Sequence, residues 1–417
     1  MAGADWIAER GWVRPDHGGA CFAALPGTIT QLLTGEAIAR PLPSAVLEGF
    51  DSSYPRIVFV YVDALSFTMA SRHADHPLLA RAANDGIVTR LTSQFPSTTT
   101  AQMPTIHSGL PVGEHGLYEW FILEPSLDRL IAPLPFTFAG DGQEPLEPHL
   151  RPQELFPERT IYEWLGERGV RTIVSGAIEF AATPASGALL RGASDVLSFV
   201  DLGDGLQALA RALAALPTPA YGFVYIDDAD SLMHRVGPGT PVVDSEVEYL
   251  LSAIERCLLR ALPAGTLLLM TSDHGMSPVS PRHTTYLNVG AQAARIESLL
   301  RRGAEPGGHV LAPAGSCRDL FLHVAPGHLD DCCEALEQLL GSRAEVRRTH
   351  ELINAGLFGP EVSPALTARL GDLVVLPEFG EAVYWYTPGR FRQTLWGQHG
   401  GLTPDEMEIP LIGVVAE

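Results

Sequence analysis

The sequence predicts an α/β fold in which a mostly parallel central sheet is flanked by helices. Short apolar runs of strand length recur along the chain, and each is followed by polar residues and then by a helical pattern. Such alternation of strand and helix is typical of a parallel sheet that is buried on both faces. The polar residues gather where the predicted strands end, which is the edge at which such sheets bind ligands. The four clearest runs are residues 56–62, 171–174, 221–226 and 266–270.

Two regions interrupt this alternation and divide the chain. Residues 122–157 are rich in Pro and Glu and form an excursion from the core. Residues 291–384 carry a strand–helix–strand pattern of their own, which predicts a smaller inserted α+β cap. We therefore expect a core made of residues 55–290 and 385–417, preceded by an N-terminal extension, residues 1–54, whose role the sequence leaves open.

The composition excludes several classes of protein. With 46% hydrophobic and 18% charged residues, the chain of 417 residues is globular rather than disordered. Its formal net charge of -21 argues against binding of nucleic acid or of anionic membranes. No apolar stretch approaches the roughly 18 residues that a membrane span needs. The chain contains no lysine, so all 28 basic residues are arginine, and a cationic contact to a substrate must come from arginine or from a metal.

The cysteines indicate a reducing compartment. They are five in number and show no CxxC spacing, so we expect neither a disulfide scaffold nor a thiolate zinc site. The N-terminal stretch is charged and lacks a continuous apolar segment, which argues against a signal peptide. Together these features predict a cytoplasmic protein, and they leave its oligomeric state open. The cysteines are Cys21, Cys257, Cys317, Cys332 and Cys333.

Aspartates and histidines occur together after two of the predicted strands. Asp230 and His234 are four residues apart, which places both on one face of a helical turn, where they can hold one metal ion. Asp273 and the adjacent His274 follow another strand. Neighbouring side chains leave an extended backbone in opposite directions, so this pair can serve two ions.

Two further residues extend this set of candidate ligands. Asp63 directly follows the first strand, and His399 lies between glycines that let the backbone approach a crowded centre. Each signal is weak alone, because Asp–His pairs are common on surfaces and the chain has 14 histidines. Asp227 and Asp228 could equally serve near their strand end. The set gains weight because its members fall at loop positions after strands.

A run of three threonines raises a separate question. It lies in the stretch FPSTTTAQMPTIHSGLPVGEHG, residues 95–116, just before a helical segment that closes at Gly109. Each of the three hydroxyls could cap the helix or act as a nucleophile.

In their order, these motifs resemble the alkaline phosphatase superfamily and most closely its nucleotide pyrophosphatase/phosphodiesterase branch. Phe95-Pro96 begins the nucleophile motif of that branch, and the fifth place is Thr99. The family's Asp-His-Gly-Met motif is intact at residues 273–276, and the closing Gly-x-His-Gly is residues 397–400. The resemblance spans roughly residues 55–417, with the cap matched by position only.

The resemblance implies an alkaline-phosphatase-like fold with two metal sites and a threonine nucleophile. Thr99 is then the nucleophile and reaches the second metal, while Thr98 and Thr100 are turn and cap residues. Nitrogen and oxygen ligands without thiolates suit Zn²⁺ and would also accept Mn²⁺. The implied ligands are Asp230, His234 and His399 for the first metal and Asp63, Asp273 and His274 for the second.

The chain departs from the family motifs close to the expected phosphate pocket. The family's Asn three residues after the nucleophile is Gln102 here, which we retain as a substrate-binding candidate. The family's Pro-Asp and Gly-His pairs have become Ala229-Asp230 and Met233-His234. Trp120 and Tyr286 follow the motifs closely enough to line the substrate cleft, although packing between core and cap would explain them equally well.

These features predict a two-metal hydrolase of phosphate esters that forms a phosphothreonine intermediate. The nearest match is a phosphodiesterase or nucleotide pyrophosphatase that acts on a small-molecule phosphate ester or nucleotide. A phosphomonoesterase or phosphonate hydrolase of the same superfamily is the alternative, and a non-catalytic metal-binding protein is a remote one. The absence of lysine favours diesters over the more highly charged monoesters. Arg235 and Arg282 are the arginines nearest to the metal motifs in sequence.

Overall fold

The central feature of the structure is a seven-stranded sheet in the order β2-β18-β9-β1-β8-β6-β7. The structure is a computed structural model that describes residues 5–140, 144–303 and 308–417. Only β18 runs against the other strands, so the prediction of a mostly parallel sheet is confirmed. The strands are β1 (Arg56–Val62), β2 (Ile87–Thr92), β6 (Arg171–Ala177), β7 (Asp195–Phe199), β8 (Ala220–Ile226), β9 (Leu267–Thr271) and β18 (Glu408–Val415).

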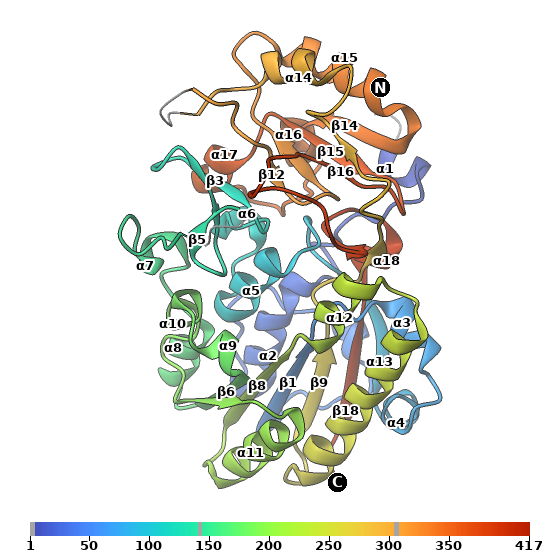
Figure 1. Ribbon diagram of the computed structural model, residues 1–417. Helices are drawn as coiled ribbons and strands as arrows, with labels where there is room; N and C mark the ends of the chain where they lie inside the picture. The colour runs from blue at the N-terminus through green and yellow to red at the C-terminus, as the bar shows by residue number, and fades with distance from the viewer. Residues whose placement is uncertain (1–4, 141–143, 304–307) are drawn as a thin grey trace.

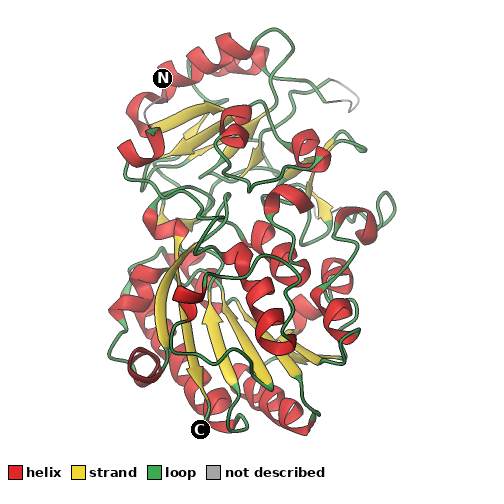
Figure 2. Ribbon diagram, turned by 180° about the vertical axis from the view of Figure 1, so that it is seen from behind, coloured by secondary structure: helices red, strands yellow, loops and turns green. Residues whose placement is uncertain are grey.

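Alternate side chains of β1 enter two separate hydrophobic cores, one on each face of the sheet. Phe59 and Tyr61 belong to one core, whereas Val58 and Val60 belong to the other. Burial on both faces explains why the central strands read as continuous apolar runs in the sequence. Helices cover both faces, as the view from behind shows (Figure 2). They are α2 (Leu25–Thr34), α5 (Thr99–Ser108), α8 (Ile161–Gly166) and α10 (Pro184–Leu189) on the first face, and α3 (Phe67–Arg72), α4 (Pro77–Asp85), α11 (Leu202–Ala215), α12 (Asp228–Val236) and α13 (Pro241–Ala253) on the second.

The segment predicted as an N-terminal extension packs on both parts of the molecule. Its helix α2 lies in the same core as β1. Its first helix, α1 (Trp6–Glu9), lies beside the smaller unit at the top of Figure 1. Arg10 forms ion pairs there with Glu345 and Glu378. This segment therefore links the core to the smaller unit. No helix in the described ranges is both long and apolar enough to cross a membrane.

Two small antiparallel sheets stand beside the main sheet. The excursion contains β3 (Ile122–Glu124), β4 (Arg129–Ala132) and β5 (Thr137–Phe138). The smaller unit has a four-stranded sheet in the order β12-β13-β15-β14, with α14 and α15 above it in Figure 1. Its elements are α14 (Ala293–Leu299), β12 (Ala314–Gly315), β13 (Leu320–Leu322), α15 (Leu329–Leu340), β14 (Ala344–Arg348), α16 (Thr349–Asn354), α17 (Pro364–Arg369) and β15 (Leu373–Pro377).

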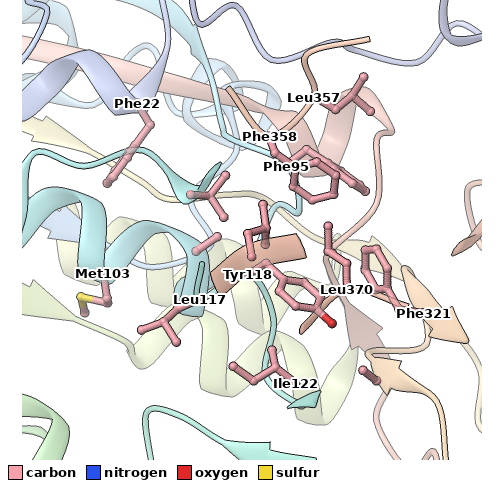
Figure 3. Close-up of a cluster of buried hydrophobic side chains, with 14 of the residues drawn as sticks. Phe22, Phe95, Met103, Leu117, Tyr118, Ile122, Phe321, Leu357, Phe358 and Leu370 are labelled. Carbon is pink, nitrogen blue, oxygen red and sulfur yellow. The ribbon is translucent and has the colours of Figure 1, made fainter. Parts of the chain in front are cut away.

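An apolar cluster joins the segment around the threonine run to the smaller unit (Figure 3). The rings of Phe95 and Phe358 lie 5.4 Å apart, and those of Tyr118 and Phe321 lie 4.9 Å apart in an edge-to-face arrangement. All four side chains are buried. Aromatic contacts of this kind stabilise a fixed orientation as well as burying area. The smaller unit is therefore packed directly against the segment that leads into α5.

A fully buried ion pair connects the smaller unit to the last turn before β18. Both N–H groups of Arg318 that face Glu406 donate to its carboxylate, at 3.0 and 2.9 Å, and neither residue is exposed. Arg318 also donates to the carbonyl oxygens of Glu378 and Glu381, both at 2.6 Å. Glu406 in turn accepts the N–H of Gly401 at 3.1 Å. The hydrogen-bond donors to the Glu406 carboxylate therefore come from the smaller unit, through Arg318, and from the loop at Gly401.

Replacing Arg318 by Met should destabilise the protein strongly. The change leaves the Glu406 carboxylate buried without its charge partner, which typically costs about 3–5 kcal/mol. Urea unfolding at neutral pH, followed by circular dichroism, measures the loss in free energy of unfolding.

Arg90→Met is the matched control, because Arg90 forms an exposed ion pair with Glu408 at 2.7 Å. Exposed pairs are typically worth less than about 1 kcal/mol. Equal losses in free energy of unfolding for the two variants would contradict a larger contribution of the buried ion pair.

Candidate active site

Thr99 begins α5 at the carboxyl edge of the main sheet and faces two of the predicted metal ligands. Its Oγ1 lies 3.3 Å from Asp63 Oδ2 and 3.1 Å from His274 Nε2. Thr98 occupies the N-cap position, but its hydroxyl makes no capping hydrogen bond. The hydroxyls of Thr98 and Thr100 are both buried without a hydrogen-bond partner among the described residues. Of the three threonines, Thr99 is thus the one whose hydroxyl contacts the predicted ligands.

Asp63, Asp273 and His274 come together because β1 and β9 are neighbouring parallel strands. Asp63 directly follows β1, and Asp273 and His274 follow β9, so their side chains leave the sheet at the same edge. One donor atom from each of the three residues lies within 4.8 Å of the others, and all three residues are buried. His274 Nε2 lies 3.2 Å from Asp273 Oδ2 and 3.5 Å from Asp63 Oδ1. This grouping is the set that the sequence assigned to the second metal.

The second group forms where the chain returns from the smaller unit. A short antiparallel pair, β10 (Ser277–Pro278) and β17 (Gly397–Gln398), brings His399 next to the segment that follows His274. Donor atoms of Asp230, His274 and His399 lie within 4.8 Å of one another. His234, from α12, reaches Asp230 with an Nε2–Oδ2 distance of 3.3 Å. All six predicted ligands thus meet, and His274 borders both groups.

The three histidines are oriented as metal ligands usually are. Each Nδ1 faces a backbone carbonyl: that of Gly397 for His234 at 2.8 Å, that of Gly275 for His274 at 2.8 Å and that of Ser97 for His399 at 3.0 Å. A carbonyl only accepts, so each Nδ1 carries the hydrogen and each Nε2 offers a lone pair to the cluster.

The carboxylates of the cluster complete a donor set that fits divalent cations. Asp63 Oδ1, Asp230 Oδ1 and Asp273 Oδ2 are buried and receive no hydrogen bond from any described residue. Buried oxygens of this kind require a positive partner. Nitrogen and oxygen donors without thiolates match Zn²⁺ or Mn²⁺. The residues present therefore fit the metals that the sequence implies.

The buried carboxylates and imidazoles of the cluster shift one another's pKa values. Burial, followed by the neighbouring charges of Asp273 and Asp230, holds the pKa of Asp63 well above its usual range. Burial would also raise the pKa of Asp230, but the neighbouring His234, through its charge and its hydrogen bond, brings it down to about 2. Burial and the adjacent His274 ring lower the pKa of His399, in keeping with a neutral ring.

The cluster opens into a cavity of about 660 Å³. Among its lining residues are Thr99, Asp230 and His399, and at its mouth lies Trp120, whose side chain is 45% exposed. Cavities of this size accommodate small-molecule ligands. The tyrosine of β8, Tyr225, also lines it and donates to Asp63 Oδ2.

A family model for type I phosphodiesterase / nucleotide pyrophosphatase matches residues 57–401, a range that includes Thr99 and all six predicted ligands. The chain belongs to this family. It is thus a phosphoester hydrolase of the alkaline phosphatase superfamily. No curated protein matches the chain in sequence.

Solved structures of this superfamily share the fold. Murine ectonucleotide pyrophosphatase/phosphodiesterase 5, in an inactive form in complex with AMP, has a TM-score of 0.62 at 17% identity, over 85% of this chain and 87% of that chain. The human protein of the same name has a TM-score of 0.63 at 16% identity, over 86% and 87%. Phosphonoacetate hydrolase from Sinorhizobium meliloti, in complex with phosphonoacetate, has a TM-score of 0.60 at 17% identity, over 88% and 92%. At such identities the likeness concerns the fold alone.

Two of the three predicted substrate-binding residues do not line the cavity of this family member. Gln102 is fully buried, because its amide accepts from Gln94 at 2.7 Å and donates to Ser93 at 2.9 Å, which holds it away from the cleft. The Tyr286 hydroxyl accepts the N–H of Gln393 at 3.1 Å and lies behind the lining. A direct substrate contact for either residue therefore stays a prediction that the lining of this cavity does not support.

His107 and His115 are buried, and both form hydrogen bonds inside the protein. The sequence gave neither residue a catalytic role. His107 Nδ1 accepts from the hydroxyl of Tyr162 at 2.9 Å, and His115 Nε2 lies 3.1 Å from Thr105 Oγ1. Burial lowers the pKa of both histidines to about 3, so both rings are neutral. Neither residue lines the cavity.

A pair of buried carboxyl groups behind His399 was not found from the sequence, because its members are far apart along the chain. Glu119 and Asp319 are about 1% and 0% exposed, and each keeps one buried oxygen, Oε1 and Oδ2, without a hydrogen-bond partner among the described residues. Two buried carboxyl groups that face each other repel unless they share one proton. Burial raises the pKa of Glu119 to about 7, and burial together with the charge of Glu119 holds the pKa of Asp319 well above its usual range.

Asp319→Asn should flatten the pH dependence of stability. The raised pKa values mean that the folded protein binds a proton that the unfolded chain has lost, so this pair favours folding at low pH. That contribution disappears as the pH rises through the pKa of Glu119, about 7. In the variant, the Asn amide donates to Glu119 without a shared proton.

The measurement is the free energy of unfolding from about pH 5 to about pH 8 at fixed zinc concentration. The native protein should lose stability relative to Asp319→Asn as the pH rises. Glu48→Gln, which changes an exposed carboxyl, is the control. A constant difference between the native protein and Asp319→Asn would contradict the shared proton.

Proposed function

We propose that this protein is a two-metal phosphodiesterase or nucleotide pyrophosphatase that acts through a phosphothreonine intermediate. The observation that carries the proposal is the position of Thr99 Oγ1, within 3.3 Å of Asp63 and 3.1 Å of His274 at the start of α5. A hydroxyl held against a buried cluster of carboxylate and imidazole ligands is placed for metal-assisted attack on phosphorus.

The ligand set assigns each metal to residues of this chain. Asp63, Asp273 and His274 would hold one ion beside Thr99, and Asp230, His234 and His399 would hold the other, with His274 at the border of both groups. We propose Zn²⁺ for both, with Mn²⁺ as the alternative. When bound, two such ions supply positive charge for the phosphoryl oxygens and lower the pKa of hydroxyl groups that coordinate them.

Thr99 then forms and breaks the bonds to phosphorus. Its hydroxyl donates to Asp63 Oδ2 before the reaction, so the departing proton already has an acceptor. Formation of the Oγ1–P bond breaks the bond from phosphorus to the leaving oxygen, and water subsequently hydrolyses the phosphothreonine. The first helical N–H groups bonded to Thr98 are those of Ala101 and Gln102. The N–H groups of Thr99 and Thr100 remain available for the phosphoryl oxygens.

The sibling activities are the alternatives to be separated. One relative is described in complex with AMP and another in complex with phosphonoacetate, so a nucleotide ester and a phosphonate both come into question as substrates. A phosphomonoesterase is the third possibility. A non-catalytic protein is disfavoured because Thr99 and all six ligands are present and converge.

The zinc-loaded protein should hydrolyse bis(p-nitrophenyl) phosphate at least tenfold more efficiently than p-nitrophenyl phosphate. The dianionic monoester needs more positive charge than the lysine-free chain brings to Thr99, and tenfold corresponds to about 1.4 kcal/mol. The second-order rate constants and the zinc content by elemental analysis, expected near two ions per chain, are the measurements.

Chelation should abolish both activities, and added Zn²⁺ should restore them. A protein that stays fully active without metal would overturn the mechanism. A clear preference for the monoester, or efficient cleavage of phosphonoacetate, would favour a sibling activity instead.

Thr99→Ala should lose several orders of magnitude in rate while keeping its metals, because only the attacking oxygen is removed. Thr99→Ser should retain part of the activity, since it keeps a hydroxyl at the same place. Single-turnover hydrolysis and metal content are measured together.

Thr98→Ala and Thr100→Ala are the matched controls, since both neighbouring threonines also line the cavity. Inactivation by one of these changes, with Thr99→Ala still active, would move the nucleophile by one residue.

A further inference from the structure

One wall of the cavity carries two arginines that the sequence did not single out. Arg390 and Arg392 lie on the segment between β16 (Val383–Tyr384) and β17, and both line the same cavity as Thr99 and His399. No other arginine is among the residues that line this cavity in the described ranges. Arg235 and Arg282, the nearest to the motifs in sequence, do not reach it.

The backbone of this segment holds both arginines toward the cleft. Phe391 is buried and its ring packs edge-to-face on Phe121 at 5.6 Å, while the N–H of buried Gln393 donates to the Tyr286 hydroxyl at 3.1 Å. Phe391 and Gln393 are thus buried on either side of Arg392, whereas Arg392 itself is exposed and lines the cavity.

A tight turn positions Arg390 just before this stretch. The N–H of Thr387 donates to the carbonyl of Phe391 at 2.9 Å, and the N–H of Arg390 donates to the carbonyl of Thr387 at 3.0 Å. The Arg390 guanidinium donates to the carbonyl oxygen of Ala139 at 3.4 Å and lies 5.6 Å from the centre of the Phe391 ring, and the residue is exposed. The turn therefore fixes the start of the side chain, and its guanidinium remains exposed at the cavity wall.

Neither guanidinium is neutralised within the described part of the chain. No carboxylate there forms an ion pair with Arg390 or Arg392, although the chain has a net charge of -21. The other acidic residues of the cavity, which are not predicted metal ligands, have other neighbours than these arginines. Glu119 pairs with Asp319, and Glu179 and Asp227 are close enough to repel each other. Among the described residues, the two arginines thus line the substrate cavity without a carboxylate partner.

We propose that Arg390 and Arg392 form an anion subsite that selects substrates with a second anionic group beyond the scissile phosphorus. The inference rests on the proposed function and narrows its substrate class. A guanidinium binds carboxylate and phosphate oxygens through paired N–H donors. The second group is therefore a carboxylate or a phosphate on the part of the substrate that does not react.

Three p-nitrophenyl phosphodiesters that differ only in their second substituent test the subsite: the ethyl, 2-carboxyethyl and 2-phosphonooxyethyl esters. In the zinc-loaded native protein, at least one of the two anionic esters should exceed the ethyl ester tenfold or more in second-order rate constant. In the Arg390→Gln/Arg392→Gln variant this ratio should fall close to one. Preference for the carboxylate or the phosphate identifies the source of the second anion.

Arg282→Gln is the matched control, because it removes the same charge near the Asp-His-Gly-Met motif but outside the cavity. It should keep the native ratio. A native ratio near one, or a ratio that survives in the double variant, overturns the subsite. Failure of the proposed function looks different, because the ethyl ester itself would then not be hydrolysed or its hydrolysis would resist chelation.

Binding without turnover gives a second measurement. For zinc-loaded Thr99→Ala protein, titration calorimetry with the same three esters should give a lower dissociation constant for an anionic ester than for the ethyl ester. Adding Arg390→Gln and Arg392→Gln should remove that difference. Equal dissociation constants for all three esters before these changes would overturn the subsite even if hydrolysis is observed.

Discussion

The site brings together buried carboxylates that repel one another, and this repulsion has to be balanced by positive charge. Asp63, Asp230 and Asp273 converge at one edge of the sheet, and each keeps a buried oxygen that no described residue satisfies. The rings of His274 and His399 stack 3.7 Å apart, an arrangement that two positively charged imidazoles would oppose. Uncompensated buried charge is among the most costly features that a protein can contain. Divalent cations would resolve both conflicts at once, so the same contacts that make the site costly to fold make it selective for metal.

The smaller unit provides none of the predicted ligands, but its hydrogen bonds hold the loop that carries one of them. Ser316, which follows β12, donates to the carbonyl of His399 at 3.0 Å, and Arg318 holds Glu406, which in turn binds the N–H of Gly401. The loop that carries His399 is thus held from the smaller unit on one side and from the last helix, α18 (Pro404–Met407), on the other. A Cβ at Gly400 would lie 2.4 Å from Asp319 Oδ1, so only glycine allows this close approach. Packing outside the ligand cluster therefore sets the position of His399, one of the predicted ligands.

The parallel sheet and the meeting of Asp63 with Asp273 could be predicted because they depend on short-range patterns. A strand buried on both faces reads as an apolar run, and its carboxyl end is the place where Asp63 and Asp273 must emerge. Local sequence patterns do not predict which way a polar side chain of a buried helix points. Gln102 follows Thr99 by one turn, yet buried polar partners decided that it faces away from the cleft. Glu119 and Asp319 are far apart in the sequence, so no local spacing of residues predicts that they pair.

The arginines explain how a lysine-free, acidic chain could still discriminate among anions. Where an arginine stabilises the fold it meets a carboxylate, as Arg318 meets Glu406 and Arg369 meets Glu124, so its charge is already used. Arg390 and Arg392 differ because their segment is anchored by apolar and backbone contacts instead of by ion pairs. The same segment continues directly into the loop that holds His399. Binding of an anion at these arginines would therefore restrain the loop that presents a metal ligand, and so join substrate recognition to the geometry of the reacting centre.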